Sequence, residues 1–119
     1  MRKIEQEMLR AITENRYFKK GNTEVIRTSC RDLGDQTHVY LHNNKIATIN
    51  FNNKTIVLSS CGWHTNTTKS RLNTIIHAFS TGSIYQKNFD WYFSSLILNM
   101  NVSFTDGMVI PFHTHWSQR

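Results

Sequence analysis

The sequence predicts an α+β fold with an N-terminal helix, an antiparallel β-meander, a second helix packed on one face of the sheet, and a C-terminal β-hairpin. Three observations predict it. Apolar residues recur at helical spacing in residues 2–15 and 69–79, they alternate with polar residues across 37–60, and a strong turn signal stands at Asp106-Gly107. The length of 119 residues is typical of one domain, so we expect residues 1–119 to form a single domain.

The first helix is expected over Arg2–Asn15. Its apolar residues Ile4, Met8, Leu9 and Ile12 follow helical spacing, with charged residues between them. Residues 23–28 alternate and contain β-branched side chains, which predicts a strand. Residues 29–36 contain Asp and Gly and are expected to form a loop.

Three further strands are expected to form the meander, because alternation continues through two closely spaced turns. Asn43-Asn44 and Asn52-Asn53 are predicted as the turns, since Asn tolerates positive φ. The predicted strands are 37–42, 45–51 and 54–60.

The second helix is predicted over Lys69–Phe79, with the hydroxyl of Thr67 or Thr68 as its N-cap. Residues 83–86 and 89–93 have the pattern of strands. Residues 94–103 fit either helix or strand, and strand is favoured after Asn99. Asp106-Gly107 then predicts a hairpin turn that leads into residues 108–112.

The formal net charge of +6 favours a partner that carries phosphate groups, although a solvated surface explains the same charge. No apolar run reaches the length needed to span a membrane. Residues 1–15 carry three Glu and so lack the apolar middle of a signal peptide, which makes the cytosol the expected location. Two cysteines are too few for a disulfide framework.

The segment that joins the meander to the second helix is the main candidate binding site. Backbone N–H groups at a helix start attract anions, and Lys69 and Arg71 add positive charge there. The indole of Trp63 can stack on a nucleobase. The alternative is structural: the indole fills the core and both cations are solvated. The candidate ligand-binding residues are Trp63, His64, Thr65, Asn66, Thr67, Lys69, Ser70 and Arg71.

A second candidate is a basic face made by Arg16, Lys19, Lys20, Lys45 and Lys54, of which the last two join the candidate ligand-binding residues. Because Lys45 and Lys54 lie at opposite ends of the middle strand of the meander, a scattered, solvated set is the alternative. Aromatic residues beside such a face would form a platform for single-stranded nucleic acid. Tyr40, Phe51 and Trp63 are the aromatic candidates.

Histidine and cysteine patterns predict neither a metal site nor a nucleophile. Zinc needs three or four convergent ligands, and neither His113/His115 nor His38/His42 supplies them locally. His64, His77 and Cys61 would converge only through folding. Cys61 is expected to be a small buried hydrophobe. We therefore expect no cofactor, no metal and no catalytic residue.

Further stretches carry a family resemblance. They are HNNKIA at residues 42–47, CGW at 61–63, TNTTKSRLN at 65–73, and QKNF with Trp91-Tyr92 at 86–92; Ile4-Glu5-Gln6 and Gly21-Asn22-Thr23 fit as well. On the basis of these stretches, the chain resembles small uncharacterised proteins of tailed bacteriophages, and the resemblance covers most of its length. The resemblance implies a phage origin and a location in the host cytoplasm, and it transfers no catalytic residue.

The leading functional hypothesis is a small, non-enzymatic phage protein that binds nucleic acid or another phosphate-bearing ligand. The competing hypothesis is a protein that blocks a host enzyme or an anti-phage defence system, including anti-CRISPR-type activity, without a membrane partner. Its candidate interface residues are Phe89, Trp91, Tyr92 and Phe93, whose alternative role is core packing. A metal-dependent enzyme is the third hypothesis.

Overall fold

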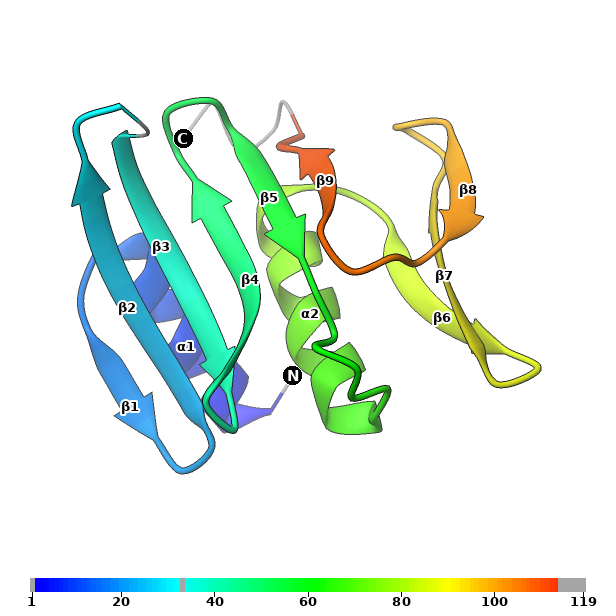
Figure 1. Cartoon of the computed structure of the whole chain (residues 1–119), viewed down its shortest axis with the longest axis horizontal. Coiled ribbons are helices and arrows are strands. Elements are labelled where there is room, and N and C mark those ends of the chain that lie inside the picture. Colours follow the sequence, from blue (N-terminus) through cyan, green and yellow to red (C-terminus); the bar gives the residue numbers. More distant parts are fainter. Residues whose placement is uncertain (1, 33, 114–119) are drawn as a thin grey trace.

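The computed structural model describes residues 2–32 and 34–113, and this part of the chain forms helices on antiparallel sheets (Figure 1). The helices are α1 (Lys3–Thr13) and α2 (Asn66–Phe79). The strands are β1 (Phe18–Lys20), β2 (Thr23–Cys30), β3 (Gly34–Leu41), β4 (Asn44–Asn50), β5 (Thr55–Leu58), β6 (Ser83–Lys87), β7 (Asp90–Ser95), β8 (Met100–Ser103) and β9 (Met108–Pro111). The predicted α+β class is confirmed.

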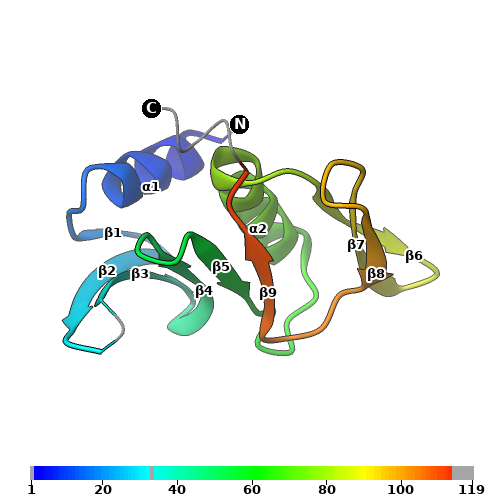
Figure 2. The same ribbon diagram turned by 90° about the horizontal axis from the view of Figure 1, so that it is seen from above.

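The strands form two separate sheets. The main sheet has the order β1-β2-β3-β4-β5-β9, and the small sheet has the order β6-β7-β8. Both helices cover the same face of the main sheet, and α2 also contacts the small sheet on its other side (Figure 2). Among the described residues, no helix lies on the opposite face of the main sheet (Figure 1). The predicted position of the second helix on one face of the sheet is therefore confirmed.

The core lies between α1, α2 and the main sheet. Met8, Ala11 and Ile12 form the buried stripe of α1, in agreement with the predicted helix. The buried residues of α2 include Leu72, Ile75, Ile76 and Phe79, which recur at the helical period. Val39, Leu41, Ile49, Ile56 and Leu58 supply the facing surface of β3–β5.

The predicted meander is confirmed, but its first turn lies one residue earlier than predicted. His42 and Asn43 occupy the turn, both with positive φ, and Asn44 already pairs with Leu41. A β-bulge in β4 then pairs Val39 with Ala47. A turn at Asn43-Asn44 would pair the buried Val39 with the outward Thr48. The observed turn and bulge instead pair Val39 with the buried Ala47, so that buried residues of the two strands share one face.

The predicted C-terminal hairpin is wrong in its pairing. Asp106-Gly107 does turn the chain, yet β8 pairs with β7 in the small sheet and β9 pairs with β5 in the main sheet. The Asp106 carboxylate accepts hydrogen bonds from Ser60 N–H and Oγ at 2.7 and 2.9 Å, which ties this turn to the end of β5. Ile110 is fully buried as a result. Burial against the core therefore outweighs local pairing across the turn.

Side-chain bonds join α2 to both sheets. The Asn73 amide donates to Ile84 O at 3.0 Å and accepts from Ile84 N–H at 2.7 Å, so it pairs with the backbone of β6 as a neighbouring strand would. Ser80 Oγ donates to Pro111 O at 2.7 Å beyond the other end of the helix. Among the described residues, no helix is long and apolar enough to cross a membrane.

Candidate functional site: a groove at the start of the second helix

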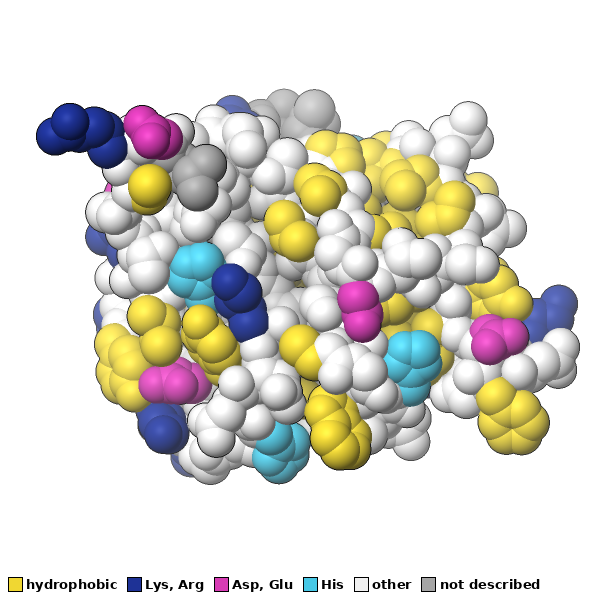
Figure 3. Space-filling model, in the orientation of Figure 1, with side chains coloured by type: hydrophobic (Ala, Val, Ile, Leu, Met, Phe, Trp, Pro, Cys, Tyr) yellow, Lys and Arg dark blue, Asp and Glu magenta, His cyan; other side chains and the backbone are white. Residues whose placement is uncertain are grey.

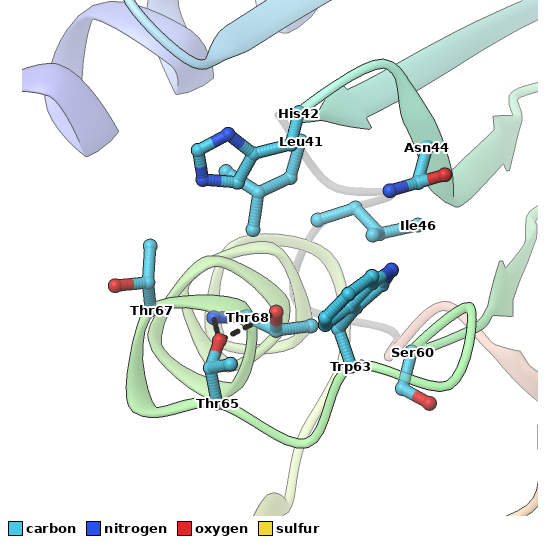
Figure 4. A pocket seen from close by; sticks show the side chains of 9 residues that line it. All are labelled: Leu41, His42, Asn44, Ile46, Ser60, Trp63, Thr65, Thr67 and Thr68. Carbon is cyan, nitrogen blue, oxygen red and sulfur yellow. Dashed lines mark hydrogen bonds between the residues drawn. The ribbon is translucent and has the colours of Figure 1, made fainter.

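A groove of about 470 Å³ lies where the β3–β4 turn meets the chain segment that enters α2 (Figure 4). Its buried apolar residues are Leu41 and Ile46, and most of its other side chains are polar but uncharged. Ligand pockets in proteins commonly have this size and this mixture of apolar walls with a few polar groups. The described lining residues are Leu41, His42, Asn44, Ile46, Ser60, Trp63, Thr65, Thr67 and Thr68.

A tight turn after β5 projects Trp63 into this position. Cys61 and Gly62 have φ of 54° and 82°, and Trp63 N–H donates to Ser60 O at 2.9 Å. The Trp63 side chain is 61% exposed, so it does not fill the core. The interpretation in which this indole is a core residue is therefore wrong, and the indole forms a wall of the groove (Figure 4).

The start of α2 is earlier than predicted. Thr65 is the N-cap: its backbone is extended, and its Oγ1 accepts a hydrogen bond from Thr68 N–H at 3.1 Å. The predicted caps, Thr67 and Thr68, lie inside the first turn instead. The apolar periodicity that predicted a start at Lys69 begins only with Leu72, so it missed a first turn made of polar residues, of which Thr68 is buried.

His64 lies away from the groove, although it follows Trp63 directly. Its ring stacks on Trp91 with centroids 4.3 Å apart and planes 15° apart. Trp91 is only 3% exposed and packs edge-on against Phe104. Trp63 and His64 therefore contribute to different surfaces.

Arg71 is a structural residue in this fold, contrary to its predicted place beside a bound anion. Its Nη1 donates to Glu5 Oε2 at 2.8 Å, its Nε donates to Thr23 Oγ1 at 3.2 Å, and its side chain is 4% exposed. Ser70 Oγ also donates to Glu5 Oε2, at 2.6 Å. Burial raises the pKa of Glu5, but the hydrogen bonds from Ser70 and Arg71 outweigh it and hold the pKa below its usual 4.5.

Helical spacing explains this burial. Arg71 lies three residues after Thr68 and four before Ile75, both of which are buried, so it shares their face of α2. Glu5 is the matching acid on the buried face of α1. The sequence signal for this ion pair is that each helix carries one charged residue, Glu5 or Arg71, among the residues of its inward face.

The other predicted cations are distributed unevenly. Lys45 is exposed in β4, between the groove residues Asn44 and Ile46. Lys54 lies beyond the other end of β4, about 20 Å of strand away, so the alternative of separate positions is correct for this pair. Lys69 is half-buried in α2 and does not line the groove. Asn66 is exposed in the first turn.

The rest of the predicted basic face is partly neutralised. Arg16 pairs with Glu14 at 2.9 Å, and Lys20 pairs with Glu7 at 3.3 Å. Lys19 pairs in register with Glu24 across β1 and β2. The basic face is therefore not a continuous surface.

The three aromatic candidates for a platform occupy different environments. Tyr40 is half-buried on the helix-free face of the main sheet, directly across from Lys45. Burial lowers the pKa of the neighbouring His38, and the charge of Lys45 lowers it further. Phe51 packs on Phe79 at the edge of the core. Among the three candidates, the indole in the groove is the most exposed.

The aromatic cluster predicted as a protein interface is divided by strand alternation. Trp91 and Phe93 are buried in the core, so the core-packing alternative is correct for both. Tyr92 is half-buried and stacks on Tyr85, with centroids 5.5 Å apart. Phe89 is 88% exposed at the β6–β7 turn.

Exposed apolar residues at the β7–β8 turn were not predicted. Leu96 and Ile97 are 96% and 65% exposed. They belong to the run 94–103, which the sequence pattern left open between helix and strand. Asn99 closes this turn with a φ of 55°, but the apolar residues Leu96 and Ile97 before it do not indicate a turn.

No three His, Cys, Asp or Glu side chains come together to hold a metal ion within residues 2–32 and 34–113. His38 hydrogen-bonds to Thr28 and Thr48. His115 lies outside the described residues. Cys61 is exposed rather than buried as expected, and its thiol donates to Lys45 O at 3.0 Å.

The fold and the groove together define a small α+β protein with an uncharged, partly apolar ligand-sized groove at a strand-to-helix junction. The model of the family described as Kyanoviridae Gp96 protein matches residues 1–111. The chain belongs to this family of bacteriophage proteins, which confirms the phage origin implied by the resemblance. No curated protein and no solved structure matches the chain.

Proposed function

We propose that this phage protein is a non-enzymatic binding protein whose groove takes a phosphate-bearing partner, with nucleic acid as the best fit. The observation that supports it is the groove itself: the exposed indole of Trp63 forms a wall, and no acidic side chain is among the described residues that line it. The protein would act in the cytoplasm of the infected cell.

Electrostatics favour an anionic partner at this place. The first turn of α2 contains no acidic residue, so its backbone N–H groups face no competing carboxylate of their own helix. Lys45 follows the groove residue Asn44 in β4, but its side chain lies on the helix-free face across from Tyr40, and it takes part in no ion pair within the described part of the chain. Its charge is therefore available to a phosphate group of a strand that continues from the groove onto that face, in a protein whose formal net charge is +6.

Salt-dependent binding of labelled single- and double-stranded oligonucleotides tests this proposal. We expect affinity to fall steeply as salt rises, because bound phosphates release counterions. Lys45→Gln should weaken binding and lower the slope of log K against log salt by about 1. Lys87→Gln is the matched control, since Lys87 is also exposed but lies in the small sheet. Absence of salt-sensitive association with every oligonucleotide would refute the proposal.

A protein partner is the second candidate function, favoured by the exposed apolar residues of the small sheet. Phe89, Leu96 and Ile97 are 88%, 96% and 65% exposed, and Val109 of the neighbouring edge strand β9 is 54% exposed. Figure 3 shows hydrophobic side chains gathered over β9 and the β7–β8 end of the small sheet. Exposed apolar patches of this kind are typical of protein interfaces.

Capture from nuclease-treated host lysate distinguishes the two candidate functions. A host protein retained by the wild type and lost from the Leu96→Ser/Ile97→Ser variant would support inhibition of a host or defence protein. Trp63→Ala serves as the matched control in this experiment, because Trp63 is similarly exposed but lies in the groove. Equal capture by wild type and the Leu96/Ile97 variant would contradict the protein-partner function.

A further inference from the structure

The geometry of the groove restricts what part of a nucleic acid it can hold. Figure 4 shows the indole of Trp63 across the pocket from the imidazole of His42, with Leu41 beside His42 and Ile46 beside Trp63. Leu41 and Ile46 are 4% and 2% exposed, so they form a closed apolar base. The opening therefore presents a flat aromatic wall above an apolar floor.

We propose that the groove binds one unstacked nucleobase of a single strand, with the base ring against Trp63. This inference rests on the proposed function and specifies its ligand. An indole that is 61% exposed has an open surface for stacking. In a duplex, each base is already stacked between its neighbours, and only a single strand, a loop or an end can turn a base outward without breaking pairs.

The polar groups of the groove match a base better than a purely apolar ligand. The Asn44 amide and the Thr67 hydroxyl are both among the lining groups, and both can donate to or accept from the edge of a base. The Thr65 and Thr68 hydroxyls already bond to each other at 2.9 Å, so they contribute mainly to the shape of the wall. A volume of about 470 Å³ accommodates a single base with its sugar, but not a nucleic-acid duplex.

Charge around the groove matches the strand backbone that must continue on both sides of the bound base. No carboxylate is found among the described lining residues, and Lys45, which follows the lining residue Asn44, has its side chain on the helix-free face of the sheet. A nucleic-acid strand whose base enters the groove therefore keeps its phosphates outside, near the acid-free first turn of α2, and reaches Lys45 only where it continues onto the helix-free face. Sequence preference is expected to be weak, because every base offers a face for stacking.

Binding of three nucleic acids of equal length tests this inference separately from the proposed function. They are oligothymidylate, the same strand with abasic sites, which keeps its phosphates but lacks bases, and a duplex. Binding of each labelled strand to the full-length protein is measured by fluorescence anisotropy at several salt concentrations. We expect oligothymidylate to bind more tightly than the abasic strand or the duplex.

Substitution of the indole provides the second measurement. Trp63→Ala should reduce affinity for oligothymidylate roughly 5- to 150-fold, with little effect on the abasic strand. Trp63→Phe, which keeps a stacking ring, should restore much of the loss. Tyr17→Ala is the matched control, because Tyr17 is 59% exposed but hydrogen-bonds to Glu24 away from the groove. Circular dichroism of each variant checks that the fold is retained.

The outcomes are distinct. Equal, salt-sensitive binding of oligothymidylate and the abasic strand, or tighter binding of the duplex, would overturn base insertion and leave the proposed function intact. Equal losses from Trp63→Ala and Tyr17→Ala would also overturn it. Failure of all three strands to bind would overturn both proposals.

Discussion

The buried ion pair between α1 and α2 allows a quantitative test of the structure. Arg71→Met removes the guanidinium that donates to Glu5 at 2.8 Å and to Thr23 at 3.2 Å. The two charged side chains are 4% and 3% exposed, so Glu5 would be left as a buried carboxylate with Ser70 as its remaining close side-chain donor among the described residues. Removing one partner of such a pair costs about 3–5 kcal/mol.

A double-mutant cycle measured by urea denaturation near neutral pH checks this magnitude. Glu5→Leu alone should destabilise by a similar amount, because it leaves the Arg71 charge buried without its acid. The Glu5→Leu/Arg71→Met double variant should cost less than either single change, since apolar side chains of similar volume can replace a buried pair at little cost. If the loss of unfolding free energy in the double variant equals the sum of the two single losses, this account of the pair is refuted.

The same pair predicts a dependence on pH. The folded-state pKa of Glu5 lies below its unfolded value near 4.5, so its contribution to stability is present above that pH. The contribution is lost as the pH falls through the lower, folded-state pKa. Urea midpoints measured from neutral to acidic pH should therefore fall less in the double variant than in the wild type. An identical fall of the urea midpoint at acidic pH in both proteins would contradict this contribution of Glu5.

Three further substitutions test local features of the fold by chemical denaturation. Thr65→Ala removes the N-cap of α2 and should cost about 1 kcal/mol, whereas Thr67→Ala should cost less; equal losses would contradict the assigned cap. Gly82→Ala should be strongly destabilising, because φ is 110° and the new Cβ would lie 2.6 Å from a carbonyl oxygen of β7. Gly107→Ala, at φ 90° in open space, should cost less, and the reverse order would refute the close approach. Phe89→Gly should leave stability unchanged or raise it by up to about 1 kcal/mol, since this exposed Phe has φ 70°; a large loss would mean that its ring supports the fold.

Local pattern was sufficient to predict most elements and much of the candidate site. The stripe of Met8 and Ile12 and the alternation through β3–β5 are properties of neighbouring residues, and they predicted the correct elements. The expectation that Trp63 and two nearby threonines contribute to one surface is consistent with the groove. Their role in ligand binding stays a prediction.

Long-range packing decided what local pattern could not. The pairing of β9 with β5 joins residues about fifty positions apart, and no residue next to the Asp106-Gly107 turn indicates that β9 pairs with β5. In the same way, helical spacing puts Arg71 on the inner face of α2, but only packing against α1 makes Glu5 its partner. His64 and Trp63 are neighbours in the sequence, and only the folded structure shows that His64 stacks on Trp91 whereas Trp63 lines the groove.

The physical reason is that residue order specifies which side chains share a face, because helical and strand periods are local. It does not specify which distant face covers them, because that choice minimises exposed apolar surface and unpaired buried charge over the whole chain. Helices, the meander and an aromatic residue at the strand-to-helix junction were therefore readable from the chain. The groove, the buried ion pair and the second sheet exist only once those elements pack together.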